Sequence, residues 1–279
     1  MKFGVFMFPT DYSMAVVDLA REVEQRGFES IWVPEHTHIP TSRRTPHPSG
    51  GDLPLEYSHA LDPFVALAAA AAATTRLRLG TGVCLVVEHD PIVLAKEVAT
   101  LDYISGGRCL FGVGGGWNRE EMQNHGTNPS QRFKVLRERM LAMKRIWTSE
   151  EAEFHGQFVD FDPIWQWPKP VQKPHPPILV GGNGPGTLKR VIEYGDEWMP
   201  IVGRGPSIDE RFAELQRLAA EAGRQPVPVS VFGAPRDQKA IESYQKLGVA
   251  RCIFWLRPGG TDETLPVLDE CAEVAASFD

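Results

Sequence analysis

The chain has 279 residues, of which 42% are hydrophobic and 23% are charged, so it has the composition of a globular protein with a sizeable core. Its formal net charge of −7 argues against a nucleic-acid partner and against an anionic membrane surface, because both are usually bound through a basic face. None of the four cysteines forms a CxxC pair, and the first residues lack the pattern of a secretory signal. We therefore expect reduced thiols and a cytoplasmic protein.

Segments with strand and helix patterns alternate along the first half of the chain. The expected strands are residues 3–8, 30–34, 77–83 and 109–113. The expected helices are residues 13–26, residues 63–73, one that begins at Asp90 and Pro91, and one that Ser130 caps. The loop over residues 35–60 is long enough to be functional or mobile.

The alternation continues in the second half after one interruption, residues 148–177, which we interpret as an insertion. The expected strands are then residues 178–180, 198–202, 227–232 and 250–256. The expected helices are residues 187–194, 208–222, 237–247 and 263–276. Eight strand–helix pairs predict an α/β fold, a (β/α)8 TIM barrel over one domain, residues 1–279. An open, doubly wound sheet is the alternative.

Sites of such barrels lie on the loops that follow the strands, and two of these loops are rich in glycine. After residues 178–180 come Gly181, Gly182, Asn183, Gly184 and, at the start of a helix, Thr187. Free backbone N–H groups and the helix dipole suit a phosphate at this point. The alternative is an ordinary strand-to-helix turn. A Walker motif is excluded because no Gly-Lys-Ser/Thr follows.

The second glycine cluster follows residues 109–113 and includes Gly114 and Gly115. Backbone without side chains allows close approach of a ring system, although a flexible turn is the alternative. Gly82, at the end of residues 77–83, is typical of a bulge at the end of a strand.

The loop after residues 30–34 begins with Glu35 and His36. A His-x-His pair, here His36 and His38, is one way to bind a metal, but we find no matching ligands at later strand ends. His36 therefore remains a candidate proton donor or hydrogen-bonding group, since histidine titrates near neutral pH. Trp117 and Trp165 are either core residues or walls of a substrate pocket.

Several runs of residues, in their order and spacing, resemble the bacterial-luciferase-like family of flavin and deazaflavin oxidoreductases, in particular its actinobacterial branch of F420-dependent enzymes. These runs are Phe3-Gly4-Val5, Trp32 to His36, Pro91 to Ala95, Leu101-Asp102, Ser105 to Arg108, Gly112 to Trp117, Trp165 to Pro170, Pro177 to Gly182 and Gly195 to Trp198. The resemblance covers residues 1 to about 202, and the last third of the chain matches only in pattern.

The resemblance implies a barrel that binds coenzyme F420 or FMN at the carboxyl ends of its strands. It implies that Glu35 and His36 lie beside the cofactor ring as catalytic residues. It also implies a non-prolyl cis peptide at Gly82 and Val83, and a phosphate held by residues 181–187. Members of the family are commonly homodimers.

One departure concerns the substrate. The sugar-phosphate dehydrogenases of the family have a catalytic glutamate after the glycines where this chain has Trp117. This difference favours an apolar or aromatic substrate pocket, to which we assign Trp117 and Trp165.

The resemblance therefore implies an F420-dependent oxidoreductase that transfers a hydride between F420 and a small organic substrate. One alternative is an FMN-dependent monooxygenase that uses O₂. A flavin or F420 reductase would supply the reduced cofactor. A second alternative is a protein that binds the cofactor without turnover.

Overall fold

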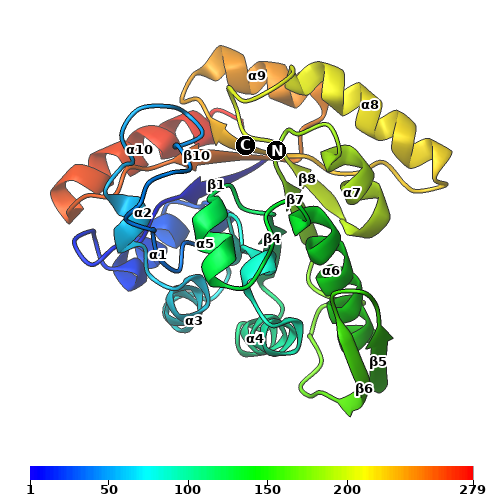
Figure 1. The fold of residues 1–279 in the computed structure, drawn as a ribbon. Helices are drawn as coiled ribbons and strands as arrows, with labels where there is room; N and C mark the ends of the chain where they lie inside the picture. Colours follow the sequence, from blue (N-terminus) through cyan, green and yellow to red (C-terminus); the bar gives the residue numbers. More distant parts are fainter. Residues whose placement is uncertain (279) are drawn as a thin grey trace.

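A parallel barrel of eight strands, surrounded by helices, forms the centre of the computed structural model, which describes residues 1–278 (Figure 1). The barrel strands are β1 (Lys2–Phe6), β2 (Ser30–Val33), β3 (Arg78–Thr81), β4 (Cys109–Val113), β7 (Ile178–Gly181), β8 (Glu197–Met199), β9 (Ser230–Ala234) and β10 (Arg251–Trp255). Their order in the sheet is β8-β7-β4-β3-β2-β1-β10-β9. Backbone bonds from Trp198 N to Pro228 O, 3.0 Å, and from Phe232 N to Pro200 O, 2.8 Å, join the two edge strands. The barrel prediction is therefore confirmed, and the open sheet is excluded.

Helices lie outside the barrel and connect its strands. They are α1 (Val16–Gln25), α2 (Glu56–His59), α3 (Pro63–Ala73), the 3-10 turn η1 (Val86–Glu88), α4 (Pro91–Ile104), α5 (Arg119–Asn124), α6 (Arg132–Thr148), α7 (Thr187–Tyr194), α8 (Ile208–Glu221), α9 (Gln238–Leu247) and α10 (Thr261–Ala276). The start of α4 follows from its sequence, because the Asp90 side chain accepts hydrogen bonds from the N–H groups of Ile92 and Val93 while Pro91 opens the helix.

The insertion and two loops contain structure that the sequence pattern did not predict. Residues 148–177 include an antiparallel hairpin, β5 (Glu151–His155) and β6 (Asp160–Trp165), which projects from the barrel beside α6 (Figure 1). The short helices α2 and α5 lie in loops. The expectation that Ser130 caps α6 is wrong, because Gln131 precedes that helix and the Ser130 hydroxyl donates to Asn128.

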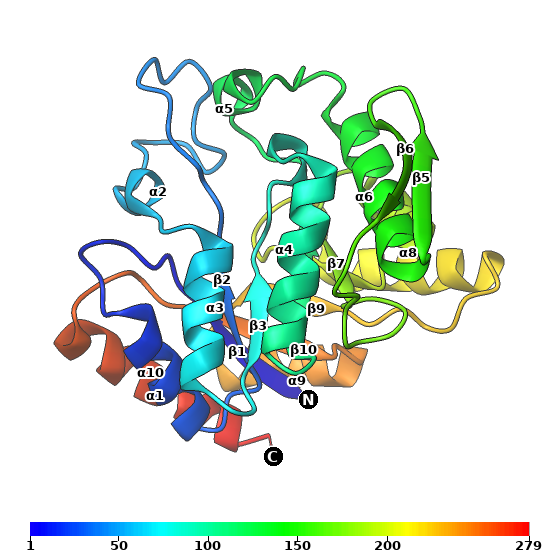
Figure 2. The same cartoon turned by 90° about the horizontal axis from the view of Figure 1, so that it is seen from below.

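The long loop after β2 and the chain termini lie at opposite ends of the barrel. Figure 2 shows the loop after β2, with α2, at the same end as α5, whereas both chain termini lie at the opposite end. The first end is the carboxyl end of the strands, where barrel enzymes place their sites.

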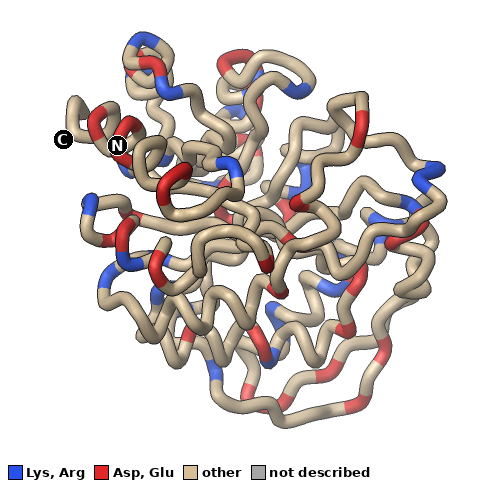
Figure 3. The backbone as a smooth tube through the Cα atoms, turned by 90° about the vertical axis from the view of Figure 1, so that its left-hand side faces the viewer, with Lys and Arg blue, Asp and Glu red and all other residues tan. Residues whose placement is uncertain are grey.

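Basic and acidic residues are intermixed along the backbone in the view of Figure 3. Within residues 1–278, none of the helices has the length and apolar character needed to cross a membrane.

Candidate active site

A cavity at the carboxyl ends of the strands brings together most of the residues that the sequence nominates. The nominated residues that line it are Glu35, His36, Gly82, Val83, Gly114, Gly115, Trp117, Gly181, Gly182, Gly184 and Thr187. They follow β2, β3, β4 and β7, which are neighbours in the barrel. The remaining wall is mostly apolar and aromatic, as in a typical small-molecule site.

The side chain of Val83 fits between two of the glycines. A Cβ on Gly114 would lie 2.6 Å from Cγ2 of Val83, and a Cβ on Gly181 would lie 2.8 Å from Cγ1. Any side chain at either position would displace Val83. The Gly82–Val83 peptide is cis, as the family resemblance implies. The glycines therefore allow the backbone and Val83 to form one wall of the cavity.

The start of α7 has the features of an anion site. Thr187, the first residue of the helix, is buried and lines the cavity, and its hydroxyl accepts a hydrogen bond from Arg190 at 3.1 Å. The guanidinium groups of Arg190 and Arg132 lie over the Phe133 ring, 3.9 Å and 4.5 Å from its centroid. Both Nε atoms are buried without a partner. A phosphate would satisfy such donors, so these residues fit a phosphorylated cofactor.

Asn183 differs from its neighbours because its side chain binds the next loop. The Asn183 amide oxygen accepts from Ile201 N at 2.9 Å, and its nitrogen donates to Ile201 O at 3.2 Å. It does not line the cavity. The residue therefore joins the loops after β7 and β8, in contrast to the expected contact with cofactor.

His36 is held by a residue that the sequence reasoning missed. Its Nδ1 lies 2.8 Å from Oε2 of Glu121 in α5, and the Glu121 side chain is fully buried. Within residues 1–278, Nε2 of His36 has no hydrogen-bond partner. One ring nitrogen is therefore fixed by a carboxylate, and the other remains available at the cavity.

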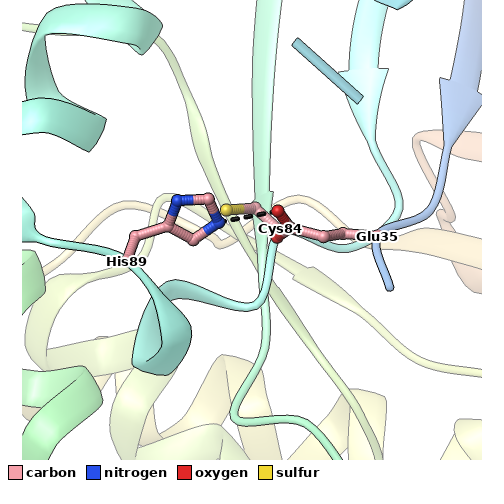
Figure 4. A group of neighbouring side chains, drawn as sticks. All are labelled: Glu35, Cys84 and His89. Carbon is pink, nitrogen blue, oxygen red and sulfur yellow. Dashed lines mark hydrogen bonds and ion pairs between the residues drawn. The ribbon is translucent and has the colours of Figure 1, made fainter. Parts of the chain in front are cut away.

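The Glu35 carboxylate, by contrast, is fully engaged. It accepts hydrogen bonds from Leu85 N at 2.5 Å and from His89 Nε2 at 2.6 Å (Figure 4). Burial opposes ionisation, but the hydrogen bond and charge of His89, followed by the bonds from Leu85 and Cys84, lower the pKa of Glu35. These bonds give Glu35 a positioning role, so the expected catalytic role does not fit its geometry.

The same cluster has three potential metal ligands, since one ligand atom each of Glu35, Cys84 and His89 lie within 4.8 Å of one another (Figure 4). Burial, and then the charge of Glu35, raise the pKa of the Cys84 thiol. Burial would lower the pKa of His89, but the hydrogen bond and charge of Glu35 raise it. A protonated thiol beside a histidine–carboxylate ion pair is a hydrogen-bonded cluster rather than a metal centre.

Aromatic rings from two loops lie at the side of the cavity next to His36: His47 and Tyr57 come from the loop after β2, and Trp117 comes from the loop after β4. Tyr57 lies 5.2 Å from the His36 ring, and Trp117 lies 5.8 Å from it. His47 lies 5.2 Å from Tyr57 and 5.7 Å from Trp117. Arg204 also lines the cavity and donates to Ser49 at 3.1 Å. These rings support the expected position of Trp117 in an aromatic pocket.

Trp165 does not line the cavity. It ends β6 on the projecting hairpin and is 76% exposed. Its assignment to the substrate pocket is wrong because residues 148–177 form a hairpin beside α6 and do not fold over the strand ends.

The sequence reasoning did not find Glu121 and Arg190, and the reason is the same for both. Glu121 and Arg190 lie on helices one or two turns beyond the glycine clusters, and only the fold shows which way they face. A signal for α5 was present, since Asn118 accepts from Glu121 N and two glutamates occupy the first turn.

The model of the luciferase-like monooxygenase family matches residues 1–249. The chain belongs to this family. It is 42% identical over 278 residues to an uncharacterized protein of Mycobacterium tuberculosis, with 98% of each chain covered. It is also 30% identical over 193 residues to an F420-dependent glucose-6-phosphate dehydrogenase of Kineococcus radiotolerans, covering 68% of this chain and 53% of that one. This luciferase-like protein is an oxidoreductase.

Two solved structures share its fold. The monooxygenase RslO1 from Streptomyces bottropensis has a TM-score of 0.83 at 23% identity, with 99% of each chain covered. The coenzyme F420-dependent tetrahydromethanopterin reductase from Methanopyrus kandleri has a TM-score of 0.77 at 17% identity, covering 100% of this chain and 99% of that one. Both comparisons therefore support the barrel fold of this chain.

Proposed function

We propose that the protein is an F420-dependent oxidoreductase that transfers a hydride between F420 and a small organic substrate. The observation that carries the proposal is the arrangement of one cavity: a wall formed by glycines and Val83, the Arg190 guanidinium in α7, and His36 at the other side. The guanidinium of Arg132, the first residue of α6, lies over the same Phe133 ring as that of Arg190. The F420-dependent names of two relatives, 30% and 25% identical, support the choice of cofactor.

Each residue of the cavity has a separate role in such a reaction. When bound, the deazaflavin supplies the hydride chemistry. Arg132, Arg190 and the start of α7 bind the phosphate, and Val83 supports the ring from behind. His36, held at Nδ1 by Glu121, exchanges a proton with the substrate oxygen at Nε2: the neutral ring accepts one when an alcohol is oxidised, and the protonated ring gives one when a carbonyl is reduced. Trp117 and Tyr57 exclude water from the same space.

The experiment is an anaerobic assay of F420H₂ oxidation with a panel of ketones, enones and imines. Substrate-dependent oxidation without O₂ is expected if the protein transfers hydride directly. A strict requirement for O₂ and for reduced FMN would favour the monooxygenase alternative, with a reductase as its partner. Cofactor binding without turnover of any substrate would favour a non-catalytic binding protein.

We also propose that the protein forms a homodimer in the cytoplasm through α3, α4 and the end of the hairpin. Helix α3 is apolar on all sides, and Val65 is 71% exposed on it. Val93 on α4, Trp165 and Trp167 are exposed as well. Gln166 attaches the hairpin to α4 through the carbonyl of Ile92 at 2.9 Å. A second copy would cover this apolar surface, and sedimentation equilibrium of wild type against Val65→Glu tests it.

A further inference from the structure

Three acidic side chains, Glu35, Glu88 and Glu121, lie at or behind the wall of the cavity, and within residues 1–278 two of them have buried oxygens without a hydrogen-bond partner. Glu121 accepts from His36 with Oε2, but its Oε1 is buried without a partner. Both oxygens of Glu88, at the end of η1, are also buried without a partner. Glu35, in contrast, is satisfied on both oxygens. Buried acceptors without donors are costly, so the Glu88–Glu121 region lacks at least one proton donor.

A proton on Glu88 supplies that donor. Burial, and then the charges of Glu121 and Glu35, raise the pKa of Glu88 to about 9, although the charge of Arg139 opposes them. The imidazole of His125 lies 3.8 Å from Oε2 of Glu88, too far for a hydrogen bond. At neutral pH Glu88 is therefore a carboxylic acid, which donates one hydrogen bond that a carboxylate does not.

The position of Glu88 connects it to the cavity. A Cβ on Gly116, which lines the cavity, would lie 3.9 Å from Oε1 of Glu88. Glu88, Glu121 and His36 come from the segments after β3, β4 and β2, three strands adjacent in the barrel. Glu88 thus lies behind Gly116 in the wall, and Glu121 contacts the imidazole of His36.

We propose that Glu88 and Glu121 form a carboxyl pair that shares one proton and positions His36. In this pair the Glu88 hydroxyl donates to the free oxygen of Glu121. Glu121 in turn accepts the Nδ1 proton of His36 and so leaves Nε2 to face the cavity. Glu121 and Glu88 are positioning residues, because they act on the reaction only through His36.

The proposal rests on the proposed function, because that function gives His36 its role in proton transfer. Its test, however, needs neither cofactor nor substrate. The full-length protein is labelled with ¹⁵N in histidine, and the imidazole signals of His36 are assigned by their loss in His36→Asn. They are then followed from about pH 5 to about pH 10, a range that includes the pH at which Glu88 loses its proton. This series reports the tautomer and every ionisation that the ring senses.

The wild-type protein is expected to carry the Nδ1 proton on neutral His36. Its signals are expected to shift near pH 9, as Glu88 loses its proton. Glu88→Gln keeps a neutral donor, so the tautomer is retained and this shift disappears. Glu121→Gln removes a charge that raises the pKa of Glu88, so the shift moves to lower pH. A purely structural role for these residues would not produce these pH effects.

Glu97→Gln is the matched control. Glu97 is also a partly buried acid whose pKa is raised, first by burial, but it lies near His89 and Asp62 rather than His36. It should leave the tautomer of His36 and the transition near pH 9 unchanged.

An Nε2 proton on neutral His36, or the absence of a transition near pH 9 in wild type, would overturn the proposal. Both results come from the wild-type protein and do not depend on the folding of a variant. Failure of F420 and FMN to bind, with the transition near pH 9 present, would reject the proposed function and leave the carboxyl pair standing. Tight cofactor binding without that transition would do the reverse.

Discussion

The side chain of Val83 fills the space beside Gly181, where an added Cβ would lie 2.8 Å from Cγ1 of Val83. Gly181 ends β7, and Val83 follows β3, so this contact crosses the end of β4, which lies between these strands. The contact therefore packs the segment after β3 against the end of β7 in the wall of the cavity.

Gly181→Ala is expected to destabilise the protein by about 1–3 kcal/mol, because the new methyl group overpacks against Val83. Val83→Ala in the same chain removes the clashing methyl groups, so the double variant should recover part of this loss. The coupling is measured from the thermal unfolding and cofactor affinity of the wild type, the two single variants and the double variant. Strictly additive effects of the two substitutions would show that the contact is absent.

Arg190→Ala is expected to weaken cofactor binding by about 1.5–3 kcal/mol, since it removes a charged donor to the phosphate. The affinity is read from a fluorescence titration. Arg137→Ala is the control, because Arg137 is an exposed arginine on α6 paired with Glu193. Equal losses in both variants would mean that general charge, rather than the site at α7, governs binding.

His36→Ala is expected to lower turnover by roughly two orders of magnitude if His36 is the proton donor. Cofactor affinity should change much less, because the phosphate site at α7 is separate. Single-turnover oxidation of bound F420H₂ with a substrate from the panel separates the two effects. Turnover equal to wild type would remove His36 from the proton-transfer role.

The Glu35–His89 pair should make the free energy of unfolding depend on pH. The pKa of Glu35 is lowered, so its contribution is present above about pH 4.5 and is lost as the pH falls through the lowered value. The pKa of His89 is raised, so its contribution is full below about pH 6.5 and is lost as the pH rises through the raised value. Their stabilising effects therefore overlap most fully between these two limits.

A double-mutant cycle with Glu35→Gln and His89→Gln measures this interaction. We expect a coupling energy of about 1–3 kcal/mol near pH 5.5, with smaller values at either side. The exposed His155–Asp160 pair serves as the control cycle and should show weaker coupling. A coupling that is constant from acid to alkaline pH would contradict the ion pair.

The sequence predicted the elements of the barrel well because their signals are local. Helices at residues 63–73 and 187–194 and the strand at 109–113 have the expected bounds, since caps, glycines and buried apolar runs lie within a few residues of one another. The glycines of the site were found for the same reason: a glycine cluster at a strand end is visible without knowing the fold.

The parts that sequence reasoning missed depend on contacts between distant segments. Glu121 meets His36 across 85 residues, and Glu35 meets His89 across 54. No local pattern shows such pairings. Trp165 was misplaced because an insertion rich in aromatic residues can cover a site or project from it with the same sequence pattern.

The central claim is that this cavity binds F420. The most direct test is a fluorescence titration of the purified protein with F420 and, separately, with FMN. We predict tight, saturable binding of F420 that Arg190→Ala weakens, together with weaker binding of FMN. Binding of FMN in preference to F420, or of neither cofactor, would contradict the account.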